Sequence, residues 1–221
     1  MNQEMLKRQV ADAVTDFITP GEILGVGAGT TVHHLIEAIA EKSIHIKGLV
    51  VCSSEAKQLA QKHGFKVLTL AEVGQLELYI DGTDEVNDAL CCLKGGGGAA
   101  TLEKITASIA SRFICIADES KLVTRLGKNA PVAIEVLQEA RGSVARACIG
   151  LGGRPVYREG FITQHGHEII DVYHLNLSEP IQLETRLNNM PGVVGHGLFA
   201  VNRPDLLLLS NQSGIRTLKP N

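Results

Sequence analysis

The chain has 221 residues, 44% of them apolar, and a mean hydropathy of +0.10, which suits a protein with a sizeable buried core in one or two domains. A formal net charge of −3, no tryptophan and only 4% aromatic residues leave neither a basic surface nor stacking platforms for a nucleic acid. The first residues, MNQEMLKRQVADAVTDFI, lack the apolar centre of a signal peptide, and no apolar run reaches the roughly 18 residues that span a membrane, so we expect a soluble, cytoplasmic protein with no membrane partner.

The first 126 residues alternate short apolar runs with amphipathic stretches. Leu6, Val10, Val14 and Phe17 recur at helical spacing, and the TPGE that follows ends this helix. The apolar runs predict strands ILGV (23–26), GLVV (48–51), KVLTL (66–70), LELYI (76–80) and FICIA (113–117), and the stretches between them predict helices over 31–41, 54–63 and 100–110. This alternation predicts an α/β protein with a mainly parallel sheet and helices on both faces.

The pattern changes after Leu126. It predicts, in order, strand VAIEVL (132–137), a helix over 142–150, strand FIT (161–163), the turn QHGH (164–167), strand EIIDVY (168–173), a helix over 180–188 and strand GVVGHGLF (192–199). The order β-α-β-β-α-β is that of the ferredoxin-like fold. We therefore expect a Rossmann-like domain formed by residues 1–128 and 203–221, whose sheet is rejoined by DLLLLS (205–210), and a smaller ferredoxin-like α+β domain over 129–202.

The cysteines and paired histidines favour a structural interpretation. Five cysteines without C-x-x-C spacing fit a reducing compartment better than a disulfide framework. Cys91 and Cys92 invite a redox interpretation, but two small apolar residues beside a strand is the better one. His165 and His167 could be half of a metal site, yet they lie in a glycine turn with no cysteine or carboxylate cluster nearby, so we expect no bound metal.

A first glycine motif, ILGVGAGTTVHHL, marks a strand-to-helix turn at Gly25, Gly27 and Gly29. Backbone N–H groups and a helix N-terminus at such a turn favour an anion. Thr30 stands where the dinucleotide-binding fingerprint has its third glycine, and the second strand ends in VVCSSEAK, with serines at its tip. The hydroxyls of Thr30 and Thr31 suit a phosphate better than a nicotinamide ribose, and a plain tight turn is the structural alternative.

Acidic residues and lysines gather at later strand ends. YIDGTDEV places Asp81 and Asp84 at the carboxyl end of a buried strand, the edge where open α/β sheets bind ligands. KGGGGAATLEK then brings Lys94, four bare glycines and Glu103, and ADESKLV adds Lys121. Turn formation by the aspartates and a helix-dipole role for the glutamate are the structural alternatives. Glycine backbone that lets a ligand approach, next to carboxylates and an ammonium, favours a site instead.

In this order and spacing, GVGAGTT, DGTDEV, KGGGGAATLEKI and ADESKLV resemble the type A ribose-5-phosphate isomerases. The similarity continues through LGGRPVYR, IIDVY and NNMPGVVGHGLFA, so it covers nearly the whole chain. The resemblance implies a homodimer that interconverts D-ribose 5-phosphate and D-ribulose 5-phosphate through an enediolate, in the non-oxidative pentose phosphate pathway, without cofactor or metal. The chain departs from the family pattern at Ala28, usually serine or threonine, and at Leu102, usually arginine.

The same resemblance implies a role for each motif residue. Glu103 matches the general base that moves a proton between C2 and C1, and Lys94 matches the cation near the ring oxygen and the developing enediolate. Asp81 and Asp84 match carboxylates that bind sugar hydroxyls and assist ring opening. The positions that match substrate-binding residues, most of them around the phosphate, are Lys7, Gly27, Ala28, Gly29, Thr30, Thr31, Gly95, Gly96, Gly97 and Lys121.

Two other kinds of protein share this glycine-loop architecture. A sugar-phosphate-sensing module of a transcription regulator would need a DNA-binding domain, and the first 20 residues supply one helix only. A related enzyme, such as an amino-sugar phosphate deaminase or a CoA transferase, also uses carboxylates on a similar sheet. Lys94 together with DGTDE favours the isomerase.

Overall fold

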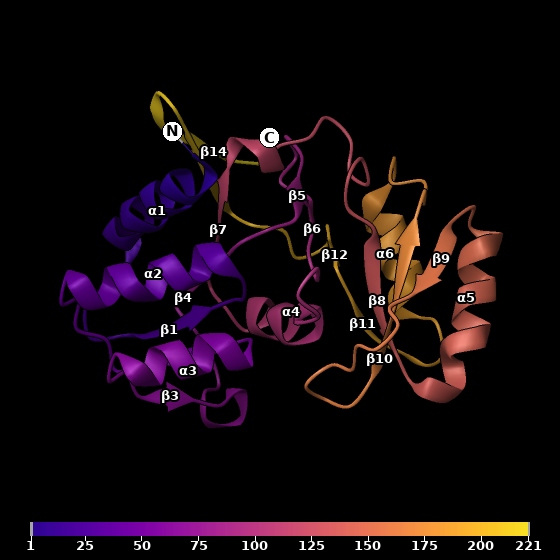
Figure 1. Cartoon of the computed structure of the whole chain (residues 1–221), viewed down its shortest axis with the longest axis horizontal. Coiled ribbons are helices and arrows are strands. Elements are labelled where there is room, and N and C mark those ends of the chain that lie inside the picture. The colour runs from indigo at the N-terminus through magenta and orange to yellow at the C-terminus, as the bar shows by residue number, and fades with distance from the viewer. Residues whose placement is uncertain (1, 221) are drawn as a thin grey trace.

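The computed structural model describes residues 2–220. Within them a large sheet of seven strands stands beside a second sheet of four, with a small sheet of three short strands between the two (Figure 1). The molecule is an α/β protein, as the sequence predicts.

The large sheet is parallel except at one edge, where the last strand turns back antiparallel on its neighbour. In spatial order its strands are β14 (Gly214–Leu218), β13 (Leu206–Asn211), β7 (Phe113–Asp118), β4 (Leu78–Asp81), β1 (Ile23–Val26), β2 (Gly48–Val51) and β3 (Val67–Leu68). Because β2 flanks β1 on one side and β4 flanks it on the other, the winding reverses between β1 and β4. Open α/β sheets bind their ligands outside the carboxyl ends of the strands at such a switch point.

Side-chain alternation along the strands decides which helix covers which face. Leu24, Val26 and Ile80 pack into one apolar cluster with three helices, whereas Tyr79 and Phe113 pack on the opposite face with the fourth. The three helices on the first face are α1 (Gln3–Val14), α2 (Thr30–Glu41) and α3 (Ser54–Lys62), and the helix on the other is α4 (Ala100–Ser108). Short 3-10 turns are η1 (Thr15–Phe17), η2 (Leu70–Glu72), η3 (Glu119–Lys121) and η4 (Gln138–Ala140). The prediction of helices on both faces is confirmed.

The second unit is an antiparallel sheet with two helices packed on it. Its elements in chain order are β8 (Val132–Val136), α5 (Arg141–Gly150), β9 (Arg154–Tyr157), β10 (Glu168–Tyr173), α6 (Pro180–Asn188) and β11 (Val193–His196). The spatial order β11-β8-β10-β9 is that of a ferredoxin-like β-α-β-β-α-β unit. The exact boundaries of the two domains stay a prediction.

One predicted strand of this unit is wrong. Residues 161–163 form no strand, and the edge strand is β9, which pairs with β10 through Val156↔Asp171. An edge strand tolerates Pro155, which lacks an N–H, and its side chains are largely exposed, so its sequence carries no alternating apolar pattern. Phe161 is apolar because it packs on the glycine run rather than in a sheet.

The predicted strand over 192–199 is in fact two strands. β11 ends at His196, and Leu198 begins β12 (Leu198–Phe199), which pairs with β6 (Cys92–Leu93) in the small sheet completed by β5 (Glu85–Val86). Gly197 separates them, because a Cβ there would lie 1.9 Å from the carbonyl oxygen of Lys94. The chain crosses between the two sheets at Gly197, whose carbonyl oxygen accepts the N–H of Lys94 at 2.8 Å.

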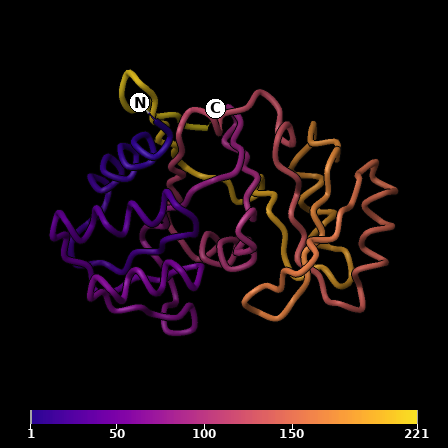
Figure 2. Tube along the Cα trace, viewed as in Figure 1, coloured from indigo at the N-terminus to yellow at the C-terminus, as the bar shows by residue number. Residues whose placement is uncertain are grey.

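The chain returns to the large sheet after the second unit. β13 pairs in parallel with β7, from Leu206↔Ile114 to Ser210↔Asp118, and Figure 2 shows this yellow C-terminal segment running back toward the first part of the chain. Within residues 2–220, no helix combines the length and the apolar composition that crossing a membrane requires. The five cysteines all lie in this range, and all are free and buried.

Candidate active site

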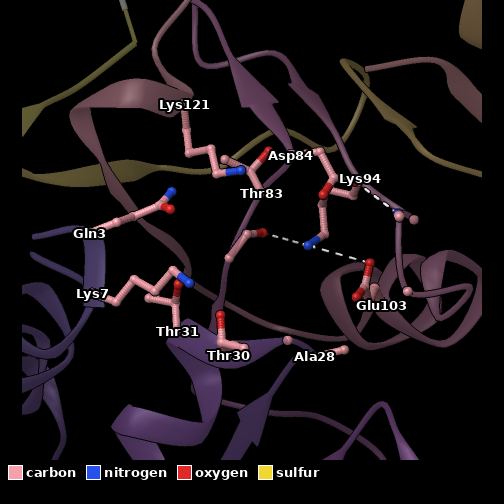
Figure 3. A pocket seen from close by; sticks show the side chains of 15 residues that line it. Gln3, Lys7, Ala28, Thr30, Thr31, Thr83, Asp84, Lys94, Glu103 and Lys121 are labelled. Carbon is pink, nitrogen blue, oxygen red and sulfur yellow. Dashed lines mark hydrogen bonds and ion pairs between the residues drawn. The ribbon is translucent and has the colours of Figure 1, made fainter. Parts of the chain in front are cut away.

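A cleft of about 310 Å³ opens at the carboxyl ends of β1 and β4 (Figure 3). Its walls come from α1, the turn into α2, the segment after β4, the glycine run with the start of α4, and η3. The predicted site residues that line it are Lys7, Ala28, Gly29, Thr30, Thr31, Asp84, Lys94, Gly95, Gly96, Gly97, Glu103 and Lys121. Motifs that are far apart in the sequence therefore share one cleft, at the switch point of the sheet.

Lys94 lies in the floor of the cleft and is only 3% exposed. Its Nζ is 2.7 Å from Oδ2 of Asp81 and 3.3 Å from Oε2 of Glu103, and it donates to the carbonyl oxygen of Gly82 at 2.5 Å. Burial by itself lowers the pKa of Lys94, but Asp81 and then Glu103 outweigh it and hold this pKa above its ordinary value. The ammonium is therefore charged at neutral pH.

Glu103 stands in the first turn of α4 with its carboxyl group buried next to Lys94. Its Oε2 accepts no hydrogen bond from any atom of residues 2–220, because Lys94 approaches it at 3.3 Å without the geometry of one. Burial raises the pKa of Glu103 to about 8, Lys94 opposes the rise, and Asp81 adds to it. A carboxyl group whose pKa lies near neutral pH, with a free acceptor oxygen, suits proton transfer.

Asp81 does not contact the cleft, contrary to the prediction that it binds a sugar hydroxyl. Its carboxylate is fully buried and accepts from the N–H groups of Ala28 (3.1 Å) and Gly82 (2.7 Å) and from the hydroxyl of Tyr79. With Lys94 at 2.7 Å as well, each carboxylate oxygen of Asp81 already has two polar partners within the protein. Asp81 holds the lysine and the turn after β1 from below.

Gly27 was predicted to bind the substrate, but it is not among the residues that line the cleft. Its N–H donates to the carbonyl oxygen of Ile80 at 3.0 Å, and a Cβ on it would lie 1.8 Å from Cγ of Asp81. Gly27 is bare so that the turn can close over Asp81, and it does not line the cleft.

The N-terminus of α2 faces the cleft, and no side chain caps its first N–H groups. Gly29, with φ +93°, is the N-cap and has no side chain to satisfy the first N–H groups of the helix. The N–H groups and hydroxyls of Thr30 and Thr31 therefore point at the cleft together with the positive end of the helix dipole. Lys7 on α1 and Lys121 on η3 extend from neighbouring segments into the same space (Figure 3). Lys7 also pairs with Glu4 at 2.6 Å. The arrangement suits an anion.

The glycine run closes the cleft on the side opposite α1, and its four members are bare for different reasons. Gly95 (φ +96°) and Gly98 (φ +76°) adopt backbone conformations that side chains disfavour. Gly96 lies against Asp84, whose Oδ2 accepts its N–H at 2.8 Å. Gly97 has only open space where a Cβ would be, so it alone fits the interpretation that the glycines leave room for a ligand.

Sequence reasoning missed four residues here. Gln3, Gly82 and Thr83 line the cleft, and Tyr79 supports Asp81 from the core. Thr83 lies inside the DGTDEV motif and could have been proposed. No local pattern indicates Gln3, because tertiary packing of α1 on α2, β7 and β13 brings it to the cleft. Among residues 2–220, no three His, Cys, Asp or Glu side chains are grouped closely enough to hold a metal ion.

A buried carboxyl group beside a buried ammonium, with an uncapped helix N-terminus and two lysines at the other end of one cleft, suits an enzyme that moves protons on a small anionic substrate. The comparisons with known proteins agree. The family model for ribose 5-phosphate isomerase A (phosphoriboisomerase A) matches residues 48–214. The chain belongs to this family. Its reaction is the aldose–ketose isomerisation of ribose 5-phosphate and ribulose 5-phosphate, a step of the pentose phosphate pathway.

Individual relatives are similar over almost their full length. The chain is 47% identical to ribose-5-phosphate isomerase A of Bordetella avium (strain 197N), covering 99% of both chains. The crystal structure of ribose 5-phosphate isomerase A from Neisseria gonorrhoeae is 41% identical, with a TM-score of 0.97 over 100% of this chain and 98% of that one. A D-ribose-5-phosphate isomerase solved in complex with phospho-erythronic acid is 33% identical, with a TM-score of 0.95 over 99% and 100% of the two chains.

Proposed function

We propose that the isomerisation proceeds in this cleft through an enediolate, with Glu103 as the single base. The observation that carries this assignment is the buried carboxyl group of Glu103, whose Oε2 is free of hydrogen bonds from residues 2–220 and lies 3.3 Å from an ammonium. On the open-chain aldose, Glu103 takes the proton from C2, and the electron pair moves toward C1 and its carbonyl oxygen. The same carboxyl returns the proton to C1, while the proton of the C2 hydroxyl passes to the oxygen on C1, and this leaves the carbonyl at C2.

Lys94 supplies the positive charge for the oxygen that gains electrons in this step. A donor that is fixed before the reaction and shielded from water stabilises such charge strongly. Asp81 is a positioning residue for Lys94 in this scheme, because it meets the ammonium and not the cleft. Asp84 does line the cleft, with its Oδ2 tied to Gly96, and it is the carboxylate that we assign to a sugar hydroxyl and to ring opening.

The phosphate is assigned to the other end of the cleft. The uncapped N-terminus of α2 at Gly29, Thr30 and Thr31 offers N–H groups and hydroxyls, and Lys7 and Lys121 offer two ammonium groups. The relative bound to phospho-erythronic acid supports the whole arrangement, since an acid phosphate combines the two negative groups that this cleft would receive at its two ends.

Replacing Glu103 by glutamine tests the assignment. Glutamine keeps the shape but cannot accept the proton, so we expect kcat and kcat/KM to fall together by roughly 10²–10⁴-fold with the sugar phosphate still bound. Ketose formation from ribose 5-phosphate measures turnover, and solvent deuterium entering C1 or C2 measures proton transfer. The matched control is Glu139→Gln on the exposed turn η4, which should keep full activity.

Parental turnover in a folded Glu103→Gln protein, or undiminished deuterium exchange, would remove Glu103 from the mechanism. Asp84 would then be the next base to replace, because it is the other carboxylate that lines the cleft.

We also propose that the enzyme is a cytoplasmic homodimer. The five buried free cysteines suit a reducing compartment, and exposed apolar side chains such as Ile149, Val156 and Ile162 offer area for a second copy. Light scattering coupled to size-exclusion chromatography gives the mass, and a monomer at micromolar concentration would contradict the dimer.

A further inference from the structure

The side chain of Arg158 crosses from the second unit to the glycine run of the cleft. Arg158 directly follows β9, and its Nη1 donates to the carbonyl oxygens of Gly95 and Gly96, both at 3.2 Å. Its Nε and Nη2 donate to the two carboxylate oxygens of Asp171 on β10, at 2.8 and 2.6 Å. Asp171 thus fixes the plane of the guanidinium, and the guanidinium fixes two carbonyl groups.

Fixing those carbonyls also fixes the N–H groups on the other side of the same peptide planes, because a trans peptide directs its C=O and N–H in opposite directions. The N–H that shares a plane with the Gly95 carbonyl belongs to Gly96, and it donates to Oδ2 of Asp84 at 2.8 Å. The N–H that shares a plane with the Gly96 carbonyl belongs to Gly97, which lines the cleft. Arg158 therefore determines where the donor at Gly97 points, without reaching the cleft itself.

An aromatic ring holds the far end of the run. A Cβ on Gly98 would lie 2.3 Å from the ring of Phe161, so this ring occupies the space that any other residue at 98 would need. The guanidinium carbon of Arg158 lies 5.3 Å from the centre of the same ring. We call Arg158, Asp171 and Phe161 the arginine clamp. All three come from the second unit, and the run that they hold comes from the first.

We propose that Arg158 is a positioning residue for the isomerisation: it keeps the peptide planes of residues 95–97 in the orientation that aims the N–H of Gly97 at the reacting end of the sugar phosphate. The inference rests on the proposed function of the cleft. The second unit then takes part in the chemistry through this clamp, and the anion site at Thr30, Thr31 and Lys121, on the opposite wall, is independent of it.

The test compares Arg158→Ala with Arg141→Ala. Arg141 is the matched control, since it also lies in the second unit, pairs with a carboxylate (Glu168, 3.1 Å) and covers an aromatic ring (Tyr157, 4.6 Å), but makes no contact with the glycine run. We expect Arg158→Ala to lose about 10²-fold in kcat, the scale of a misplaced or lost donor. Its KM and the inhibition constant of inorganic phosphate should stay within about threefold, because the anion site is untouched. Arg141→Ala should change none of the three.

Chemical rescue separates a positioning role from a general loss of structure. Guanidinium ion at millimolar concentration should restore kcat of Arg158→Ala in a saturable way, whereas sodium chloride at equal ionic strength should not. Arg158→Lys keeps the charge but cannot hold one carboxylate and two carbonyls in a fixed plane, so it should lose kcat as well. If the alanine variant does not fold, the lysine variant decides by the same comparison of kcat with KM.

Three results would overturn the proposal: kcat within twofold of the parent in folded Arg158 variants, an equal loss in Arg141→Ala, or a loss confined to KM and phosphate inhibition. Glu103→Gln measured in parallel keeps this outcome apart from a failure of the proposed function. If that variant stays active, the assignment of the cleft is wrong, whatever Arg158 does.

Discussion

At the scale of single residues, the burial of Glu103 is what makes the site chemically unusual. The carboxyl group has an ammonium 3.3 Å away, yet its pKa lies above the ordinary 4.5, because burial outweighs Lys94 and Asp81 already shares that ammonium. The same burial that raises this pKa therefore opposes folding once the carboxyl group is ionised.

This cost predicts how stability depends on pH. A carboxyl group with a raised pKa binds its proton more tightly when folded, so its stabilisation is complete below pH 4.5 and is lost as pH rises toward about 8. Glu103→Gln has no such proton to lose. We expect the melting temperature of the parent to fall relative to Glu103→Gln between pH 5 and about 8, by roughly 2–4 °C for each kcal/mol of linkage. Calorimetry at several pH values measures the gap, and a constant gap would contradict the raised pKa.

At the scale of elements, the longer segments with a buried apolar face were predicted well, whereas the buried two-residue strands β5 and β6 and the exposed edge strands β9 and β14 were not. Apolar residues at regular spacing made the inner strands and three of the helices predictable, because one face of each element is apolar and buried. These helices span 30–41, 54–62 and 100–108. β9 was not predicted, because an edge strand with Pro155 and largely exposed side chains has no alternating apolar pattern. The apolar residues 161–163 were predicted as the strand instead. The complete burial of Asp81 was not predicted, because it depends on Gly27, which is distant in sequence. Gly27 has no side chain, so the backbone can close over the carboxylate of Asp81.

The glycine run gives a prediction at this scale. A methyl group on Gly97 meets no atom within 4 Å and requires no positive φ, so Gly97→Ala should change the free energy of unfolding by less than about 0.5 kcal/mol. If the sugar lies against this position, kcat/KM should nevertheless fall by roughly tenfold or more, since the methyl occupies the cleft. Gly74→Ala, equally free of contacts but outside the cleft, is the control. Equal kinetics in the two variants would place the sugar elsewhere.

At the scale of the whole molecule, the two units are joined by buried polar contacts as well as by chain. Glu135 on β8 is 4% exposed and accepts hydrogen bonds from Thr101 on α4 and, at 2.7 Å, from Thr163 in the connection between β9 and β10. The helix α4, which carries Glu103, is therefore anchored in the second sheet. No local sequence pattern could have shown this, because the partners come from three separate segments.

Removing that anchor should be felt by the whole fold. Glu135→Ala leaves the hydroxyls of Thr101 and Thr163 buried without their acceptor, and we expect the free energy of unfolding to fall by about 2–4 kcal/mol. Glu139→Ala, on the exposed turn η4, should stay within about 0.5 kcal/mol of the parent. Urea denaturation followed by circular dichroism makes the comparison, and equal values for the two variants would mean that the anchor contributes nothing.

The return of the chain to the large sheet has a consequence for the order in which the protein is made. β7 is synthesised long before β13, which pairs with it on one side. In the same way, β6, next to Lys94, is synthesised long before its partner β12. Until residues 198–211 are synthesised, the nascent large sheet has an open edge of unpaired N–H and C=O groups, and the backbone of Lys94 has no Gly197 to bond. Every residue that lines the cleft is then already synthesised, but the backbone of Lys94 still lacks its partner. A truncated chain that ends before β12 should therefore expose an aggregation-prone edge, and we expect the cleft to be completed only when the last strands are in place.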